Sequence, residues 1–338
     1  MKVFARTILA CAVSAAACTP AFAHHSAAAF DTQTEATITG TITEYSFRNP
    51  HVYMTLSRKL EDGTEVTTEV EAGAGSVIGP LGFTRDSVKV GDVVSIAGNP
   101  GKRDPQGLFL GRELFKEDGT YLPLNISSRS AVPENTEAAT SIEGTWFSPR
   151  TSFFAFLGGA RDWKTTDAGK AVLASAATVS TPTPAKDCVP IGSPALMFYP
   201  VANLIDVQDD KVVMTIDWLD SVRTFYLDGR EHPPASETSL HGHSTAHWEG
   251  TTLVADTTNF AVNPIGLSTT LPNSTQKHLV ERFELSVDGK GMIYSGLVED
   301  PEYLSAPIEW TGTWQYRPDM QLSNETCDLE TARKFLDD

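Results

Sequence analysis

The chain lacks several features that would point to common functional classes. It has four cysteines in 338 residues, and its 43 acidic residues outnumber 26 basic ones, which gives a formal net charge of −17. Such an acidic surface repels phosphate backbones and anionic membranes, so we expect neither a nucleic-acid partner nor peripheral lipid binding. Beyond the amino-terminal segment, no stretch approaches the ~18 consecutive apolar residues of a membrane-spanning helix, so no membrane insertion is expected.

Motifs of the common enzyme classes are also missing. The sequence contains no G-x-S-x-G, no glycine-rich phosphate loop, no G-x-G-x-x-G and no H-E-x-x-H. The common hydrolase, kinase, nicotinamide-dependent and zincin classes therefore lack their defining residues.

Residues 1–23 have the pattern of a secretory signal peptide. Two basic residues precede an alanine-rich apolar stretch that ends in an A-x-A cleavage site. Cleavage after Ala23 would make His24 the first residue of a periplasmic or secreted protein with a free α-amine. Lipid attachment at Cys18 is the alternative, although Ala15 is a poor residue for the start of a lipobox.

Cleavage leaves two cysteines, Cys188 and Cys327. In an oxidising compartment an even pair of cysteines usually forms a bridge. We expect a Cys188–Cys327 disulfide, which would close a loop of about 140 residues and contribute ~4 kcal/mol of stability. Two free buried thiols are the alternative.

Residues 24–126 predict a small β domain. Five segments have strand patterns, and a short helical or loop insert at 75–84 follows the third. This order is typical of an OB-like five-stranded barrel. Many OB folds bind nucleic acid, but acidic residues outnumber basic ones here, so the positively charged groove of such proteins is missing. The five segments are 36–49, 51–60, 64–71, 92–97 and 108–115.

A second domain is expected at 143–338, after a linker at 127–142 that lacks apolar periodicity. Residues 163–177 have the best helical pattern in the chain, and antiparallel strand patterns fill most of the sequence from 211 onward. Six or more strands in meander order predict an antiparallel up-and-down β-barrel. Gly144-x-Trp146 resembles the opening of lipocalin-like (calycin-like) barrels. Because strand patterns dominate both domains, the whole protein is expected to be mainly β.

Charged residues share strand faces with apolar neighbours in this second domain. Arg223 alternates with Phe225, Glu281 lies on an apolar face, and Asp256 shares its face with a valine. A charge on such a face must be paired or must serve a ligand. We expect Arg223 and Glu281 either to form a structural ion pair or to line a cavity for a small, partly apolar molecule. Phe225, Asp256 and His241 complete that ligand-binding set.

Four of the eight histidines lie between His232 and His247. His243 or His232 could transfer a proton while Arg223 holds an anionic or enolate oxygen, and Asp228 completes this candidate catalytic set. His241 and His243 are expected on one strand face, where imidazoles could bind zinc or copper, but no further pair completes a tetrahedral set. Surface histidines or satisfied structural histidines are the plain alternative.

Cleavage after Ala23 would place His24 and His25 at the mature amino terminus, where they could chelate a metal ion. The α-amine and ring nitrogen of His24, with one more imidazole, would form a three-nitrogen site suited to Cu(II). His51 is the preferred third ligand, and His25 is the alternative. A soluble leader without metal, or adventitious nickel or zinc, explains the same residues.

Two patterns resemble a known family. HHS…FD…TGT…NPH, at residues 24–51, is similar to the amino-terminal module of exported bacterial proteins of unknown function. DGRxHP…GHS…WEG, at 228–250, resembles a second module that often follows it, although His247 stands where that module is expected to carry arginine. The resemblance implies export and a two-domain layout, and it implies no reaction.

Two functional classes therefore remain. The first is an exported periplasmic protein that binds a small, partly apolar molecule in its second barrel, with copper as the candidate metal at its amino terminus. The second is an enzyme of the lyase, hydratase or isomerase type that uses histidine acid/base chemistry in the same barrel. A purely structural envelope protein would leave both polar sets without a role, and the sequence does not indicate the oligomeric state.

Overall fold

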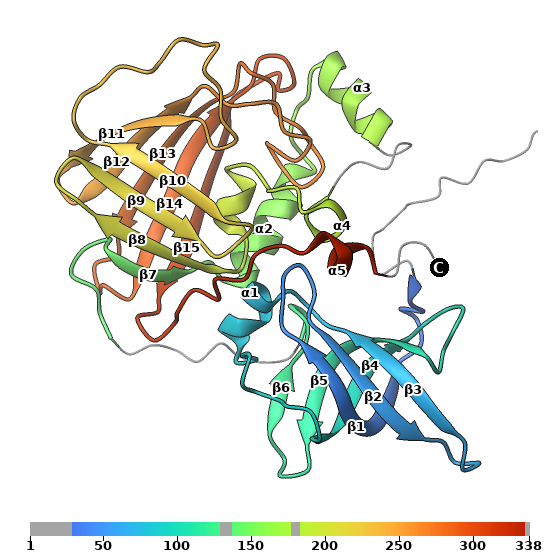
Figure 1. The fold of residues 1–338 in the computed structure, drawn as a ribbon. Helices are drawn as coiled ribbons and strands as arrows, with labels where there is room; N and C mark the ends of the chain where they lie inside the picture. Colours follow the sequence, from blue (N-terminus) through green and yellow to red (C-terminus); the bar gives the residue numbers. More distant parts are fainter. Residues whose placement is uncertain (1–28, 129–136, 177–182, 335–338) are drawn as a thin grey trace, which may run out of the picture.

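The computed structural model describes residues 29–128, 137–176 and 183–334, and it shows two β-barrels connected by loops and short helices (Figure 1). The expectation of a mainly β protein is confirmed. Strands β1–β6 lie within residues 36–123 and strands β7–β15 within residues 144–316. Among the described residues, no helix is long and apolar enough to cross a membrane.

The first barrel has the predicted OB-like connectivity. Its strands are hydrogen-bonded in the order β3-β2-β1-β4-β5, and a parallel pairing of β3 with β5 closes the ring. A short helix, α1 (Gly75–Ile78), sits between β3 and β4, where the insert was expected. The strands are β1 (Ala36–Ser46), β2 (Tyr53–Lys59), β3 (Glu65–Glu71), β4 (Val93–Pro100) and β5 (Leu108–Lys116), and β6 (Tyr121–Pro123) extends the sheet beyond β5.

Period-two alternation builds this barrel, because one face of each strand fills a common apolar core. Ile38 and Ile42 of β1 are buried with Leu56 of β2 and Ile96 of β4. Gly98 lies at a register shift between β4 and β5, where an added Cβ would stand 2.0 Å from the carbonyl oxygen of Leu110. A side chain at that position would therefore separate the two strands.

The second barrel closes with nine strands in the order β10-β11-β12-β13-β14-β15-β7-β8-β9. All neighbours are antiparallel except β10 and β11, which are parallel. An odd number of strands cannot alternate in direction all the way around a closed ring, so the antiparallel barrel that was expected contains one parallel pair. The strands are β7 (Gly144–Phe147), β8 (Ala202–Val207), β9 (Lys211–Ile216), β10 (Ser221–Tyr226), β11 (His243–Glu249), β12 (Thr252–Thr258), β13 (His278–Leu285), β14 (Gly291–Glu299) and β15 (Ile308–Tyr316).

The predicted helix at 163–177 is present as α3 (Asp167–Ala176), but a further helix, α2 (Arg150–Ala160), was not predicted. Strand β15 pairs with β7 only at Gln315 and Tyr316, so most of that edge of β15 has no neighbouring strand within the part of the chain that the structure describes. Helix α2 lies beside this edge (Figure 1), where the Ser152 hydroxyl donates a hydrogen bond to the Thr313 carbonyl over 3.3 Å. Two short helices complete the fold, α4 (Pro184–Asp187) and α5 (Leu329–Arg333).

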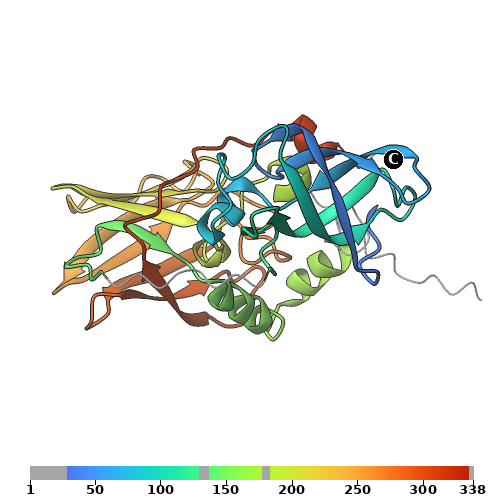
Figure 2. The same ribbon diagram turned by 90° about the horizontal axis from the view of Figure 1, so that it is seen from below.

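Residues 317–334, here called the carboxy-terminal strap, leave the second barrel and run back to the first, as Figures 1 and 2 show. The predicted Cys188–Cys327 disulfide is confirmed and joins residues 139 positions apart. The Asn49 side-chain amide donates to the Glu325 carbonyl over 2.8 Å, and the Asp328 N–H donates to the Asn49 carbonyl over 3.0 Å. The strap is therefore a connection between the barrels and lies outside the ring of strands β7–β15.

Candidate functional site

Arg223 and Glu281 form an ion pair inside the second barrel. The two side chains are 1% and 0% exposed, and Nη1 of Arg223 donates to Oε1 of Glu281 over 2.8 Å. The Tyr294 hydroxyl donates to the same oxygen over 2.8 Å. Burial opposes the charge on Arg223, but the adjacent carboxylate more than offsets it, so the pKa of Arg223 is raised. Of the two alternatives drawn from the sequence, the structural ion pair is the one observed.

Aromatic side chains fill the space around this pair. Phe225, Phe283, Tyr294 and Trp314 are each at most 1% exposed, and the Arg223 guanidinium lies 4.8 Å from the centre of the Phe225 ring. Arg223, Phe225 and Glu281 therefore contact one another and the packed core. The expectation that these three residues line a ligand cavity is wrong, because aromatic packing occupies the space such a cavity would need.

Asp256 and His241 lie apart from each other. Ala255 is paired across the sheet with Glu281, which faces inward, so its neighbour Asp256 points to the outer face of the wall. His241 lies near the interior, where burial and the charges of Arg223 and Lys277 lower the pKa of its imidazole to about 3. The predicted ligand-binding set is thus divided between two faces of one barrel wall.

His241 and His243 do not share a strand face as expected. Strand β11 begins only at His243, and Gly242 between the two histidines has a φ of 70°. An added Cβ on Gly242 would lie 2.4 Å from the Thr258 carbonyl oxygen, so glycine allows both the turn and the close approach. The turn separates the two imidazoles, which removes the two-histidine metal arrangement.

On the outer face, five side chains form a continuous hydrogen-bonded series, here called the histidine chain. Its central member, Asp256, contacts His232 Nε2 through Oδ1 over 3.0 Å and His278 Nε2 through Oδ2 over 2.8 Å. Nδ1 of His232 lies 3.1 Å from Nδ1 of His243, and Nδ1 of His278 lies 3.4 Å from Glu299 Oε2. The series therefore runs His243–His232–Asp256–His278–Glu299.

Strand register and one loop bring these residues together. Asp256 is paired with Val280 across β12 and β13, two residues from His278, and His278 is paired directly with Glu299 across β13 and β14. His232 comes from the connection at 227–242, which crosses between the parallel strands β10 and β11. No local sequence pattern links His278 or Glu299 to the other members, and only the sheet register identifies them.

The charges along the histidine chain differ in sign and origin. The hydrogen bond to Asp256 raises the pKa of His278, assisted by the charges of Asp256 and Glu299. The hydrogen bond from His278 in turn lowers the pKa of Asp256. Burial, followed by His232 and Arg230, lowers the pKa of His243. Near neutral pH the chain therefore holds an ionised carboxylate at its centre and a neutral imidazole at the His243 end.

Asp228 and Arg230 support this end of the chain. The Asp228 carboxylate accepts a hydrogen bond from Nε of Arg230 over 2.9 Å, and this guanidinium lowers the pKa of Asp228 to about 2. The guanidinium lies 3.6 Å above the ring of Tyr226, which stacks on His243 at 5.2 Å. His243, His232 and Asp228 are thus neighbours, as the catalytic set requires.

Arg223 does not belong to that set. Ser244 faces inward and exchanges a hydrogen bond with Thr257 over 2.8 Å, so His243 beside it faces outward. The guanidinium of Arg223 is enclosed with Glu281 on the other side of the wall. The expectation that Arg223 and His243 act on one bound molecule is therefore wrong.

A groove of about 470 Å³ lies between α2 and the unpaired edge of β15. Four aromatic side chains line it, and threonine, serine and glutamate side chains complete the lining. The sequence did not reveal this groove, because α2 was not predicted and α2 forms one of its walls. The four aromatic residues are Phe156, Trp163, Phe198 and Trp310.

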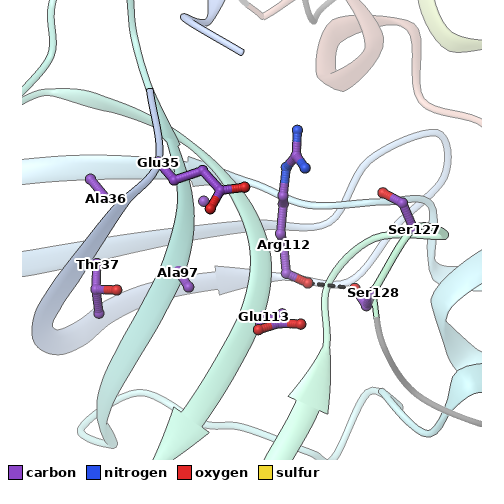
Figure 3. Close-up of a pocket in the computed structure, with 9 residues that line it drawn as sticks. Glu35, Ala36, Thr37, Ala97, Arg112, Glu113, Ser127 and Ser128 are labelled. Atoms are coloured by element: carbon purple, nitrogen blue, oxygen red, sulfur yellow. Dashed lines mark hydrogen bonds between the residues drawn. The ribbon is translucent and has the colours of Figure 1, made fainter. Parts of the chain in front are cut away.

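A second hollow of about 340 Å³ lies on the first barrel (Figure 3). Glu35, Glu113 and Arg112 bring charges of both signs to it, and the Ser128 hydroxyl donates to the Arg112 carbonyl over 2.6 Å. Figure 3 shows the Arg112 guanidinium directed away from that carbonyl. With no aromatic residue in its lining, this hollow offers an apolar molecule little contact surface.

The predicted copper ligands are only partly described. His24 and His25 lie outside the described residues, whereas His51 is buried, with Nδ1 3.4 Å from Oε1 of Glu71. Within residues 29–128, 137–176 and 183–334, no group of three or more histidine, cysteine, aspartate or glutamate side chains is arranged to hold a metal ion.

The expected copper site of His24, with His51 or His25 as its third ligand, stays a prediction, because His24 and His25 lie outside the described residues.

The fold and these sites define a two-barrel protein whose first barrel has known relatives by sequence. Residues 12–109 match the model of a family described as "Family of unknown function (DUF6152)". The match ends within the fifth strand of the first barrel, and it agrees with the expected resemblance to an uncharacterised family. No curated protein matches the chain.

Proposed function

We propose that the protein is exported and binds a small, partly apolar molecule in the aromatic groove between α2 and β15. The observation that carries this proposal is the groove itself, where an incomplete barrel wall leaves two half-buried tryptophans, Trp163 and Trp310, partly accessible beside two buried phenylalanine rings. Small-molecule sites are usually concave, with mostly apolar linings and a few polar groups that orient the ligand. A groove of about 470 Å³ is within the size range of such sites.

The groove walls are held by close packing. Phe156 of α2 stacks on Phe198 at 4.4 Å, and Gly312 of β15 leaves room for Phe198, since an added Cβ would lie 2.4 Å from its ring. Trp310 lies against Gly296 in the same way, with 2.6 Å to an added Cβ. Because these rings are fixed before binding, little side-chain entropy would be lost when a flat ligand enters.

Export is supported by two independent features. The Cys188–Cys327 disulfide is typical of an oxidising compartment. The amino-terminal pattern of a basic region, an apolar stretch and an A-x-A site is typical of a secretory signal. We therefore propose the periplasm or the cell exterior as the place where the ligand is met.

The experiment uses N-phenyl-1-naphthylamine, an aromatic probe whose fluorescence rises in apolar sites. Ala155 is exposed on α2 and lines the groove, so Ala155→Trp should fill the groove without disturbing the core. The matched control is Phe154→Trp, which adds an indole at the adjacent exposed position outside the groove. We expect probe binding to weaken at least roughly tenfold in A155W, a loss of about 1.4 kcal/mol, and to persist in F154W. Equal binding by A155W and the wild type would rule out the groove as the binding site.

A further inference from the structure

We infer that the outer wall of the second barrel carries a separate catalytic site, in which Nε2 of His243 is a general base that activates water for ester hydrolysis. Asp256 and His232 are its positioning residues, because they act only through His243. This site is on a different surface from the aromatic groove and does not depend on ligand binding there.

The hydrogen bonds define the tautomer of each imidazole in turn. An ionised carboxylate only accepts, so His232 must donate from Nε2 to Asp256. When His232 carries a single ring proton, that proton is on Nε2, so its Nδ1 holds a lone pair to which Nδ1 of His243 donates. The remaining nitrogen of His243, Nε2, therefore carries a lone pair and is the only ring position of His243 able to accept a proton.

This nitrogen is free to react. Among the described residues, Nε2 of His243 has no hydrogen-bond partner, and the side chain is half-buried on the outer face. Its ring is held on one side by the stacked Tyr226 and at Nδ1 by His232. A base with a fixed ring and one open nitrogen meets the geometric requirement for general-base catalysis.

Burial and the surrounding charges keep this base unprotonated near neutral pH. The titratable and charged groups that face His243 are His232 and Arg230, which disfavour its protonation, and Asp228, which favours it. Burial is the largest effect and acts in the same direction as His232 and Arg230, so the pKa of His243 lies below its ordinary value. At the far end of the chain, His278, whose other ring nitrogen contacts Glu299, completes the bonding of Asp256 and helps to keep that carboxylate ionised.

The reaction balances with water alone. Nε2 of His243 takes one proton from a water molecule, and the resulting hydroxide forms a bond to the ester carbonyl carbon. The bond between that carbon and the alcohol oxygen breaks, the alcoholate leaves with the electron pair, and the proton passes from His243 to the alcoholate or to solvent. While the proton is on His243, the positive charge is stabilised by Asp256 through His232.

The test measures hydrolysis of p-nitrophenyl acetate by the full mature chain between pH 4 and 9. We expect the rate to rise as the pH passes through the lowered pKa of His243 and then to level off. The rate in excess of that of free imidazole should be roughly 100-fold lower in His243→Gln than in the wild type. Asp256→Asn should reduce the plateau roughly tenfold while leaving KM unchanged, because the asparagine cannot stabilise the protonated chain.

The matched control is His247→Gln, on the same strand and the same outer face but outside the histidine chain. It should hydrolyse the ester as fast as the wild type. Long-range 15N–1H spectra of labelled wild-type protein supply a second readout, expected to show the His243 proton on Nδ1. Hydrolysis by H243Q at the wild-type rate, or a His243 proton on Nε2, would overturn the inference.

Discussion

Removing one member of the buried ion pair should destabilise the second barrel strongly. The change is Glu281→Gln, which keeps the size of the side chain and removes its charge. Arg223 is then left 1% exposed with no carboxylate partner. At an effective dielectric constant of 20, two unit charges 4 Å apart attract by about 4 kcal/mol. Breaking buried pairs typically costs a similar amount, about 3–5 kcal/mol.

Urea unfolding, followed by tryptophan fluorescence with the disulfide intact, measures this loss. We expect the midpoint to fall while the slope with denaturant stays the same, since the area exposed on unfolding hardly changes. The double variant Arg223→Met with Glu281→Met should recover most of the loss, because well-packed apolar pairs often replace buried ion pairs at no net cost.

A surface ion pair formed by Arg282, the residue that follows Glu281, provides the control. Arg282 donates to Glu249 over 2.8 Å, with side chains 40% and 50% exposed. Arg282→Gln should cost less than about 1 kcal/mol, since solvent screens such pairs. If E281Q cost as little as R282Q, the interior pair would have to be hydrated, and the account of a packed barrel interior would fail.

Two further predictions concern the disulfide and the histidine chain. Replacing Cys188 and Cys327 by serine should lower the free energy of unfolding by about 4–5 kcal/mol, the amount expected for a closed loop of this length; urea unfolding with and without reductant measures it, and an unchanged midpoint would contradict it. Because the pKa of His278 is raised in the folded state, its contribution to stability is fully present below its unfolded value of 6.5 and is lost as the pH rises through the folded value. The difference in Tm between wild type and His278→Gln should therefore shrink between pH 6 and 9, and a difference that is constant or grows would reject this assignment.

The parts of the fold that depend on local patterning could be predicted from the sequence. The alternation around Ile38 and Ile42 locates the first strand, and the residues after each strand mark the turns, because both signals depend on neighbours in the chain. The disulfide was predictable for a different reason, since only two cysteines lie beyond the predicted signal peptide. Arg223 and Glu281 were identifiable as a pair because each interrupts an apolar face.

What could not be predicted depends on contacts between distant segments. The helical segment at 150–160 has two adjacent glycines and little amphipathic character, so its helix depends on packing against Phe198 rather than on its own pattern. Asp256 shares the valine side of its strand, yet Val254 is a buried outer-face residue, so apolar neighbours there did not mark the interior. His278 and Glu299 become partners of Asp256 only through strand register, which a single sequence does not specify.

The position of the strap in the sequence also determines the order in which the two barrels fold and are joined. Synthesis proceeds from the amino terminus, and domains generally fold as units in that order. The groups that hold Asn49, the Glu325 carbonyl and the Asp328 N–H, lie beyond the last strand of the second barrel. The first barrel can therefore fold before the residues that attach it to the second barrel have been synthesised. The two barrels are joined only after the segment around Cys327 has been made.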